Sequence, residues 1–465
     1  MKKKILSIVL ILTFIAGLTG CVNKSGTNPD SNTSSNISGT ADTAASKETD
    51  AKAKGTGEKT VVTFQTWNPM DSGPESAIHK IISDFEAKNP DITINYVYVD
   101  SGSHFEQLKV KLMGGEGPDL YGMRTGSYFE AFRDFEEDIT PYCKSTWGDN
   151  WESKFYDFCM KPLATDGKYY AVPLGITYAG FAWCDKNMLK SYGLDIPASY
   201  SDLLEASKVL RKNKQFPLAI GAKDTWLDVD TWMSMANDIN SEKLYSAIEG
   251  KTPFTDTDLV KSFEIWQKCF TDGIFQDGAL GMTQYNDVND MFQKEGSIPM
   301  FLNGSWALNM FTLADAETHK VFNSEGADHD IFLIDWNDDG KVCPVTAAAD
   351  VLLCMNKNSK VKDAAFKFMD YLVNEGQDLL VNNYLEYMPS RTDMKLNVQG
   401  LGADGQEALQ VVLNNAKDNV AGARSIVYAE LDTKVQEVLQ ALAAGQMTPQ
   451  EAAEQVEAVS KTTKR

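Results

Sequence analysis

The sequence predicts an α/β fold in which crossover helices flank a mainly parallel sheet. From residue 61 to residue 121, runs rich in β-branched and aromatic residues alternate with segments of helical periodicity. Turn-forming residues such as Asn89-Pro90 and Gly114-Gly115 separate them. Parallel neighbours need a crossover connection, and this β-α-β-α-β order supplies it. Ligands of such sheets bind beyond the carboxyl ends of the strands.

Strands are expected where β-branched and aromatic residues run together between turn signals. In chain order they cover residues 61–64, 92–99, 120–121, 169–172, 180–184, 216–220, 298–302 and 351–355. Pro173-Leu174-Gly175 separates two of these runs, because proline and glycine interrupt regular structure.

Helices are expected where apolar residues recur every three or four positions, as Ile78, Ile81, Ile82 and Phe85 do. In chain order they cover residues 78–85, 103–113, 200–212, 258–271, 287–294, 361–375 and, as two helices, 427–460. Ser201 is expected to cap the helix at 200–212. The last helix begins with Thr448, Pro449 and Glu451, the pattern of a capping box.

The first 20 residues have the pattern of a signal peptide. Lys2, Lys3 and Lys4 precede an apolar run at 5–15, which is shorter than the roughly 20 residues of a membrane span. Leu18-Thr19-Gly20-Cys21 resembles a bacterial lipobox, which implies that Cys21 carries diacylglyceryl and palmitate chains. The chain is then expected to be anchored to the outer face of the cell membrane. An ordinary signal peptide with a chance cysteine is the alternative.

Residues 21–58 are expected to form the lipidated cysteine and a flexible linker. No aromatic residue occurs between residues 22 and 58, and Val22 and Ile37 are the only large aliphatic residues. Such a segment cannot bury enough apolar surface to offset the entropy of ordering it. About 400 residues remain for the body, enough for two domains.

Composition excludes several classes of protein. The net charge is -21, whereas nucleic-acid binding needs a basic patch. The four histidines belong to no HExxH motif, and the chain has no GxSxG, Walker A or complete dinucleotide loop. We therefore expect no catalytic residue, no metal and no cofactor.

Free buried thiols are favoured over disulfides for the six cysteines after Cys21, although an extracellular location permits both.

Four blocks of sequence carry a resemblance to a known family. The blocks are Gly117-Pro118-Asp119-Leu120, then Tyr170-Ala171-Val172-Pro173 through Asp185-Lys186 to Tyr192-Gly193-Leu194, then Phe292 to Gly296 through Met300 to Asn303-Gly304-Ser305-Trp306, and finally Ala364 to Phe368 through Met388-Pro389-Ser390-Arg391. Together they resemble the sugar-type extracellular solute-binding proteins of bacterial ABC importers, the family that includes maltose-binding protein. Each block is weak alone, but their order and spacing over most of residues 60–460 are specific.

The resemblance implies a two-lobe fold of the type II periplasmic-binding-protein kind. Lobe 1 is expected at 59–175 plus 341–395, and lobe 2 at 176–340 plus 396–465. Each lobe is expected to hold a mainly parallel sheet flanked by helices, and closure buries a ligand between the lobes. The implied function is capture of a small solute, a mono- or oligosaccharide, for the transmembrane permease subunits of an ABC importer. A monomer without enzymatic activity is expected.

Sugar binding suggests which residues to examine, because a pyranose has apolar C–H faces and a polar rim. Trp67, Trp226 and Trp306 each follow a predicted strand, where the cleft is expected. The resemblance implies that Trp306, in the Gly-x-Trp turn, stacks on the sugar. Each tryptophan also has a structural alternative. Trp306 could pack in the core of its lobe, and Trp67 and Trp226 could pack against their own loops.

Polar partners for hydroxyl groups complete the expected ligand site. They are Asn68 after the first strand, Arg124 after the third, Thr177 and Tyr178 at the crossing between lobes, and Asp350 before a buried strand. Maltose-binding protein has a glutamate in place of Thr177, so a charge is missing here, and this weakens the carry-over of its substrate. A solvated Arg124 and a structurally bonded Asp350 are the alternatives.

Three other features are assigned structural roles or stay open. Asp119 is expected to be structural at a strand start, and Trp232 is expected in the core. Asp335, Asn337, Asp339 and Gly340 match half of an EF-hand loop, but the glutamate of position 12 is missing, so a turn is favoured over Ca²⁺ binding.

Two rival functions stay open. One is an extracellular carbohydrate-sensing or surface scaffold lipoprotein. The other is a glycoside hydrolase, since the chain has abundant carboxylates.

Overall fold

The computed structural model describes residues 59–67, 77–312, 326–398 and 400–465, all of them in one compact unit. Cys21, Asn68, the signal peptide and the linker lie outside the described residues. Two sheets organise the unit, and the larger has the strand order β11-β10-β3-β1-β2, with β6 paired to β10 as well. Its strands are β1 (Thr60–Thr66), β2 (Ile92–Tyr98), β3 (Leu120–Met123), β6 (Ala171–Ala179), β10 (Val345–Met355) and β11 (Val420–Ala423).

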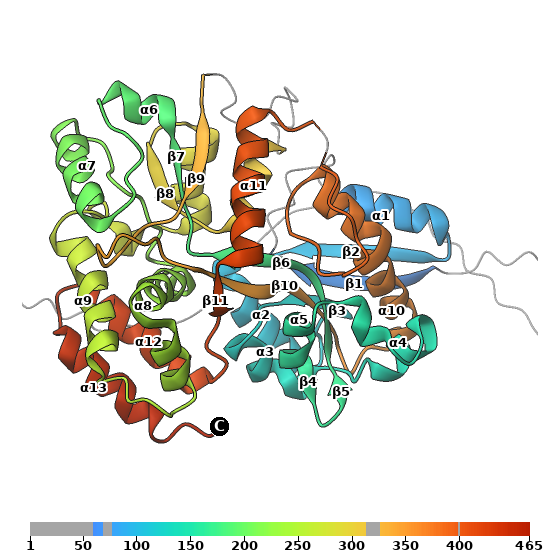
Figure 1. Ribbon diagram of the computed structural model, residues 1–465. Helices are drawn as coiled ribbons and strands as arrows, with labels where there is room; N and C mark the ends of the chain where they lie inside the picture. Colours follow the sequence, from blue (N-terminus) through green and yellow to red (C-terminus); the bar gives the residue numbers. More distant parts are fainter. Residues whose placement is uncertain (1–58, 68–76, 313–325, 399) are drawn as a thin grey trace, which may run out of the picture. The chain divides into compact units, whose positions relative to one another are not determined.

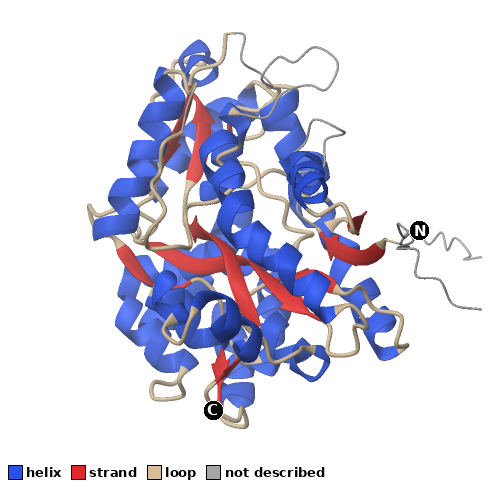
Figure 2. Ribbon diagram, turned by 90° about the vertical axis from the view of Figure 1, so that its right-hand side faces the viewer, coloured by secondary structure: helices blue, strands red, loops and turns tan. Residues whose placement is uncertain are grey.

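The predicted β-α-β-α-β order is confirmed at the start of the body. β1 pairs in parallel with both β2 and β3, and the helices between them are α1 (Ala77–Lys88) and α2 (Ser101–Met113). α1 buries Ile78, Ile81 and Phe85, the face that periodicity predicted. Asp100 caps α2 by accepting a hydrogen bond from the Ser103 N–H at 3.1 Å. Figure 2 shows helices on both sides of the strands.

The strand β10 connects the parts of the larger sheet. Along one edge it pairs antiparallel with β6, from Thr346 to Cys354. Along the other edge its start pairs in parallel with β11 and its end antiparallel with β3. β6 and β10 therefore run together through the middle of the unit, as Figure 1 shows.

The smaller sheet has the order β8-β7-β9 and consists of β7 (Ala182–Asp185), β8 (Met300–Leu302) and β9 (His329–Phe332). Both of its pairings are antiparallel, so the expectation of a mainly parallel sheet in each lobe is wrong for this sheet. The α/β class itself is confirmed. The separate hairpin of β4 (Ala164–Thr165) and β5 (Lys168–Tyr169) lies beside the larger sheet.

Helices make up most of the remaining structure. They are α3 (Ser127–Phe132), α4 (Thr140–Trp147), α5 (Asp157–Met160), α6 (Lys186–Ser191), α7 (Tyr200–Lys212), α8 (Thr225–Ile248), α9 (Thr257–Thr271), α10 (Lys362–Tyr371), α11 (Ala403–Asp418), α12 (Ala429–Ala443) and α13 (Pro449–Ser460). α8, α9, α12 and α13 pack against one another, at the lower left of Figure 1. The capping box of Thr448 and Glu451 at α13 is confirmed. Among the described residues, no helix combines the length and apolarity that crossing a membrane requires.

Three local predictions are wrong. The cap of α7 is Ser199, whose Oγ accepts from the Asp202 N–H at 3.2 Å, because Ser201 instead bonds to Asp338. Residues 216–220 form only isolated bridges, in which Leu218 and Ala219 pair beside Phe275 and Phe301. β6 continues through Pro173 to Gly175, since a proline is tolerated in a strand at a sheet edge.

The predictions for structural residues are confirmed. Asp119 accepts hydrogen bonds from the Thr63 N–H and the Ser359 hydroxyl at 2.9 and 2.6 Å. Trp232 is fully buried and stacks on Phe263 at 4.9 Å between ring centroids. Asp335 accepts from the N–H groups of Asp339 and Gly340 and so closes a turn. The cysteines Cys143, Cys159, Cys184, Cys269, Cys343 and Cys354 are free and buried.

A buried carboxyl in the first half of the chain makes stability depend on pH. Glu136 is 4% exposed, and burial raises its pKa from 4.5 to about 8, against the opposing effect of Arg133. Its Oε1 accepts a hydrogen bond from the Cys354 thiol at 3.3 Å. The folded protein therefore keeps Glu136 protonated at pH values where the unfolded chain has released that proton.

Because the folded-state pKa lies above the unfolded one, Glu136 lowers stability as pH rises from about 4.5 to about 8. We expect Glu136→Gln to raise the free energy of unfolding at pH 8 by roughly 2 kcal/mol and to leave it nearly unchanged at pH 4.5. Thermal unfolding across this pH range measures both. Glu137→Gln is the control, since Glu137 pairs with Lys362 near the surface. Equal slopes for the wild type and Glu136→Gln would contradict the expectation.

Candidate functional site

A cavity of about 60 Å³ lies where several segments distant in sequence meet. Its lining comprises residues 124–128 after β3, the first turns of α8, the middle of β10, the residues after β11, and α12. The lining residues are Arg124, Thr125, Ser127, Tyr128, Trp226, Val229, Asp230, Ala348, Asp350, Arg424, Ser425, Asp432 and Gln436. Arg124, Trp226 and Asp350, predicted from sequence as ligand contacts, are thus brought together.

Arg124 lies among aromatic rings at one wall of the cavity. Its guanidinium carbon is 4.7 Å from the ring centroid of Trp226 and 5.6 Å from those of Trp67 and Phe105. Tyr128 is slightly farther, at 5.9 Å. Arg124 makes no hydrogen bond or ion pair with any residue that the structure describes. Its N–H groups are therefore available to a ligand, and the rings hold its charge by cation–π attraction.

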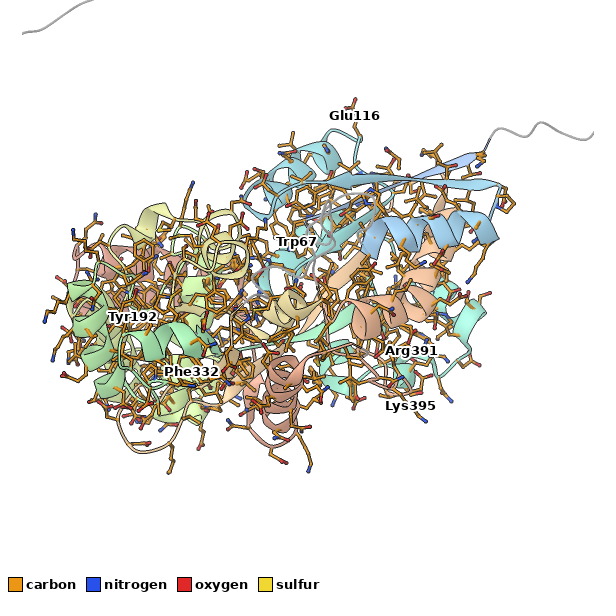
Figure 3. All side chains as sticks on the ribbon, turned by 90° about the horizontal axis from the view of Figure 1, so that it is seen from above. Trp67, Glu116, Tyr192, Phe332, Arg391 and Lys395 are labelled. Carbon is orange, nitrogen blue, oxygen red and sulfur yellow. The ribbon has the colours of Figure 1, made fainter. Side chains whose placement is uncertain are left out.

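The three predicted tryptophans gather around this wall, but they differ in their access to the cavity. Trp226 lines it and lies 6.0 Å from Trp306, between ring centroids. Trp306 is only 8% exposed. Trp67, labelled in Figure 3, is 5% exposed and packs on His104 and Phe105 at 5.0 Å. Of the three, only Trp226 lines the cavity, whereas Trp67 and Trp306 pack near residues that line it.

Arg424, which sequence reasoning missed, is at the centre of a buried ionic network. Its Nε and Nη2 contact Asp230 Oδ2 at 3.0 and 2.9 Å. Its Nη1 donates to Thr177 Oγ1 at 2.6 Å and contacts Asp350 Oδ2 at 3.3 Å. The guanidinium carbon lies 4.2 Å from the ring centroid of Trp306. No motif marks this arginine, because its partners are 74 to 247 positions away in sequence.

Close packing fixes the segment that carries Arg424. The Arg424 N–H donates to the Ala347 carbonyl of β10 at 3.0 Å. A Cβ on Gly422 would lie 2.5 Å from the Tyr245 ring, and one on Gly126 would lie 2.7 Å from Ser425 Oγ. Only glycine permits these approaches, and Gly126 also has a φ of +74°, which favours glycine.

Two other predicted contacts, Thr177 and Tyr178, do not line the cavity. Thr177 is 1% exposed and joins the network through its hydroxyl, which also donates to Asp350 Oδ2 at 3.3 Å. The backbone N–H of Tyr178 donates a hydrogen bond to Ser305 Oγ at 2.9 Å. Burial raises the pKa of the Tyr178 hydroxyl to about 12. Asn68 and Cys21 lie outside the described residues.

A third acidic residue of the cavity wall, Asp432 on α12, connects this wall to α3. It accepts from the Ser127 hydroxyl at 2.7 Å and from Gln436 Nε2 at 3.0 Å. Burial raises its pKa to about 6, although these two hydrogen bonds lower it. Burial also raises the pKa of Asp230, against the effect of Arg424.

Several buried polar atoms in and beside the wall have no partner among the described residues. They are Nε1 of Trp226, Nε1 of Trp306 and Oδ1 of Asp350. Buried polar groups are nearly always hydrogen-bonded in native proteins, so these atoms call for a ligand or water. Together with Arg124, Trp226 and Asp350 bring donors and an acceptor to residues that line one cavity. A molecule rich in hydroxyl groups matches that mixture, because each hydroxyl donates and accepts.

Comparison with known proteins identifies relatives of one kind. The model of a family described as bacterial extracellular solute-binding proteins matches residues 80–407. A multiple sugar-binding protein of Streptococcus mutans is 25% identical over 247 residues, 50% of this chain and 55% of that protein. An uncharacterized ABC transporter extracellular-binding protein of Pyrococcus horikoshii is 24% identical, over 51% of this chain and 54% of its own. The chain thus spans about half the length of these curated relatives.

Solved structures show the same fold at lower identity. A protein from work on xylan use by a thermophilic Caldanaerobius matches with a TM-score of 0.72 and 18% identity, over 86% of this chain and 99% of that one. A maltose-bound T. maritima protein matches with a TM-score of 0.65 and 17% identity, over 87% and 99%. A Listeria monocytogenes ABC substrate-binding protein in complex with cycloalternan matches at 0.66 and 18%, over the same shares. The matched family is described as solute-binding proteins, and the likeness to these structures shows a shared fold.

Proposed function

The chain belongs to the bacterial extracellular solute-binding proteins, and from that premise we propose that it captures a small neutral sugar for an ABC importer. The ligand is a mono- or oligosaccharide bound in the cavity of Arg124, Trp226, Asp350 and Arg424. The loaded protein docks on the transmembrane permease subunits and releases its ligand there. The sugars named for its relatives and structural neighbours, such as maltose and cycloalternan, motivate this class of ligand.

The single observation that carries the proposal is the combination of an aromatic ring with unpaired donors and an unpaired acceptor. Trp226 presents an indole to the cavity, and such a ring contributes about 1 kcal/mol beyond burial when it stacks. Arg124 supplies free N–H donors, and Asp350 Oδ1 supplies an acceptor. A sugar satisfies all of them at once, whereas a purely apolar ligand would leave the polar atoms buried and unpaired.

Charge balance favours a neutral ligand over an acidic one. The cavity is lined by two arginines and by three aspartates, Asp230, Asp350 and Asp432. Arg424 neutralises part of this negative charge through its contacts with Asp230 and Asp350. A sugar acid would bring a further carboxylate close to these aspartates, and like charges at such distances repel.

Ligand entry requires movement, because a cavity of about 60 Å³ holds only a few water molecules. Arg124 on the β3 side and Trp226 on α8 both line it, and the Arg124 guanidinium carbon lies 4.7 Å from the Trp226 ring centroid. We infer that the lobes at 59–175 plus 341–395 and 176–340 plus 396–465 separate along this contact. The ligand then replaces Arg124 on the face of Trp226, and closure stabilises the complex.

Thermal unfolding with a panel of maltose, xylobiose, diacetylchitobiose, tagatose and ribitol tests this function. A ligand at one hundred times its Kd stabilises the folded state by about 2.7 kcal/mol. We expect at least one neutral sugar to raise the unfolding midpoint and glucuronate to have no effect at equal concentration. Stabilisation by glucuronate or by amino acids alone would contradict a neutral-sugar site.

The anchor at Cys21 is part of the same proposal, since a captured solute must be handed to a membrane protein. Lipidation there and the linker up to residue 58 would keep the body close to the permease. In cell fractions, we expect the wild-type chain with the membranes and Cys21→Ser in the soluble fraction. Wild-type chain that is released in soluble form would contradict lipid anchoring.

A further inference from the structure

We propose that Arg424 is a positioning residue, which orients Asp350 so that its Oδ1 becomes the acceptor for a ligand hydroxyl. The inference rests on the proposed function for the presence of a ligand. It goes beyond that function, because it assigns distinct tasks to the two oxygens of one carboxylate and a role to a residue that no pattern in the sequence marks.

The contacts of Asp350 are asymmetric. Its Oδ2 lies 3.3 Å from Arg424 Nη1 and 3.3 Å from the Thr177 hydroxyl, which donates to it. Its Oδ1 is buried and has no partner among the described residues. With Oδ2 held from two sides, rotation of the carboxylate about its last bond would break both contacts. The orientation of Oδ1 is therefore fixed before any ligand arrives, and this lowers the entropy lost on binding.

Thr177 links the two charged groups. Its Oγ1 accepts from Arg424 Nη1 at 2.6 Å and donates to Asp350 Oδ2 at 3.3 Å. The direction of these bonds is set by chemistry, since a guanidinium can only donate and a carboxylate only accept. A valine at this position would keep the shape of the side chain but remove both bonds.

Arg424 is itself held rigidly enough to act in this way. Its side chain is 12% exposed, and that of Asp230, its partner on α8, is 8% exposed. The guanidinium uses separate N–H groups for Asp230 and for the pair of Thr177 and Asp350, while its flat face covers Trp306 at 4.2 Å. A lysine has one ammonium and cannot make this set of contacts, although it keeps the charge.

The test uses Arg424→Lys, Arg424→Met, Thr177→Val and Asp350→Asn, with whichever of maltose, xylobiose and diacetylchitobiose binds the wild type most tightly by calorimetry. We expect Arg424→Lys to bind at least tenfold more weakly while keeping most of the thermal stability of the wild type. Arg424→Met weakens binding at least 30-fold, and Thr177→Val about fivefold. If only the positive charge of Arg424 mattered, and only for stability, Arg424→Lys would keep both the affinity and the thermal stability of the wild type.

A double mutant decides whether Arg424 acts through Asp350. If it does, Arg424→Lys combined with Asp350→Asn binds within about threefold of the weaker single variant, because the second change removes nothing more. Losses of affinity that multiply in the double mutant would overturn the proposal.

Arg391→Met is the matched control: Arg391 has a side chain 18% exposed, pairs with Asp393, and lies away from Trp67 in Figure 3. Its affinity should equal that of the wild type.

A ligand-free measurement keeps this proposal separate from the proposed function. In crystal structures of Arg424→Lys and Thr177→Val, we expect the Asp350 carboxylate to rotate from its wild-type orientation. An unchanged carboxylate in both variants overturns the positioning role even if sugars bind. If no sugar binds the wild type, the proposed sugar-binding function is refuted instead. The rotation of the Asp350 carboxylate in the variants then still tests whether Arg424 positions it.

Discussion

Replacing Trp226 with alanine is expected to weaken sugar binding by about 30-fold, equivalent to about 2 kcal/mol. Trp226 is the one tryptophan that lines the cavity, and it also contacts Arg124 at 4.7 Å and Tyr285 at 6.0 Å. The loss combines about 1 kcal/mol from stacking with the apolar area that alanine cannot bury. Isothermal titration of the wild type and the variant measures it.

Two further variants make this result specific. Trp226→Phe keeps a ring and is expected to retain binding within about tenfold of the wild type. Trp147→Ala is the control, since Trp147 is a half-buried indole on α4 that bonds to Asp370 and does not line the cavity. Equal affinities for Trp226→Ala and the wild type would remove Trp226 from the site.

Gly304→Ala is expected to reduce both affinity, by at least tenfold, and stability, by about 1–3 kcal/mol. A Cβ on Gly304 would lie 1.9 Å from Cζ3 and 2.3 Å from Cη2 of Trp306. An indole cannot bend out of the way, so Trp306 must leave the face of Arg424 or the 3-10 turn Ser305–Phe311 must shift. Either change disturbs the network that holds Asp350. Calorimetry and thermal unfolding report the two effects separately.

Gly281→Ala is the matched glycine control, because a Cβ there meets nothing within 4 Å. We expect it to keep the affinity and the unfolding midpoint of the wild type. If Gly304→Ala behaves in the same way as Gly281→Ala, then Trp306 is not needed where the structure places it.

Regular elements could be predicted from the sequence because their signals are local. The face of Ile78, Ile81 and Phe85 and the capping box at Thr448 both depend on residues a few positions apart. Sheet direction is not local in this sense. The three strands β7, β8 and β9 come together from residues 182, 300 and 329, so their antiparallel arrangement follows from tertiary packing rather than from any pattern within a strand.

The candidate site was predictable only in part, for the same reason. Arg124 follows β3 and Trp226 lies in the first turn of α8, where the rule for α/β sheets places ligand sites. Asp350 lies in the middle of β10, and all three residues meet at one cavity. Arg424 follows a four-residue strand with no motif around it. Its importance is visible only once Asp230, Thr177 and Asp350 are close in space. Trp306, which the resemblance expects to stack on the sugar, is covered by Arg424, and only the structure could reveal this contact.

The most direct measurement is a crystal structure of the protein grown with the neutral sugar that stabilises it most. We expect the sugar in the cavity between Arg124 and Trp226, with a hydroxyl within hydrogen-bonding distance of Asp350 Oδ1 and a ring face on the Trp226 indole. A sugar bound elsewhere on the molecule, with Arg124 still seated on Trp226, would contradict capture at this cavity.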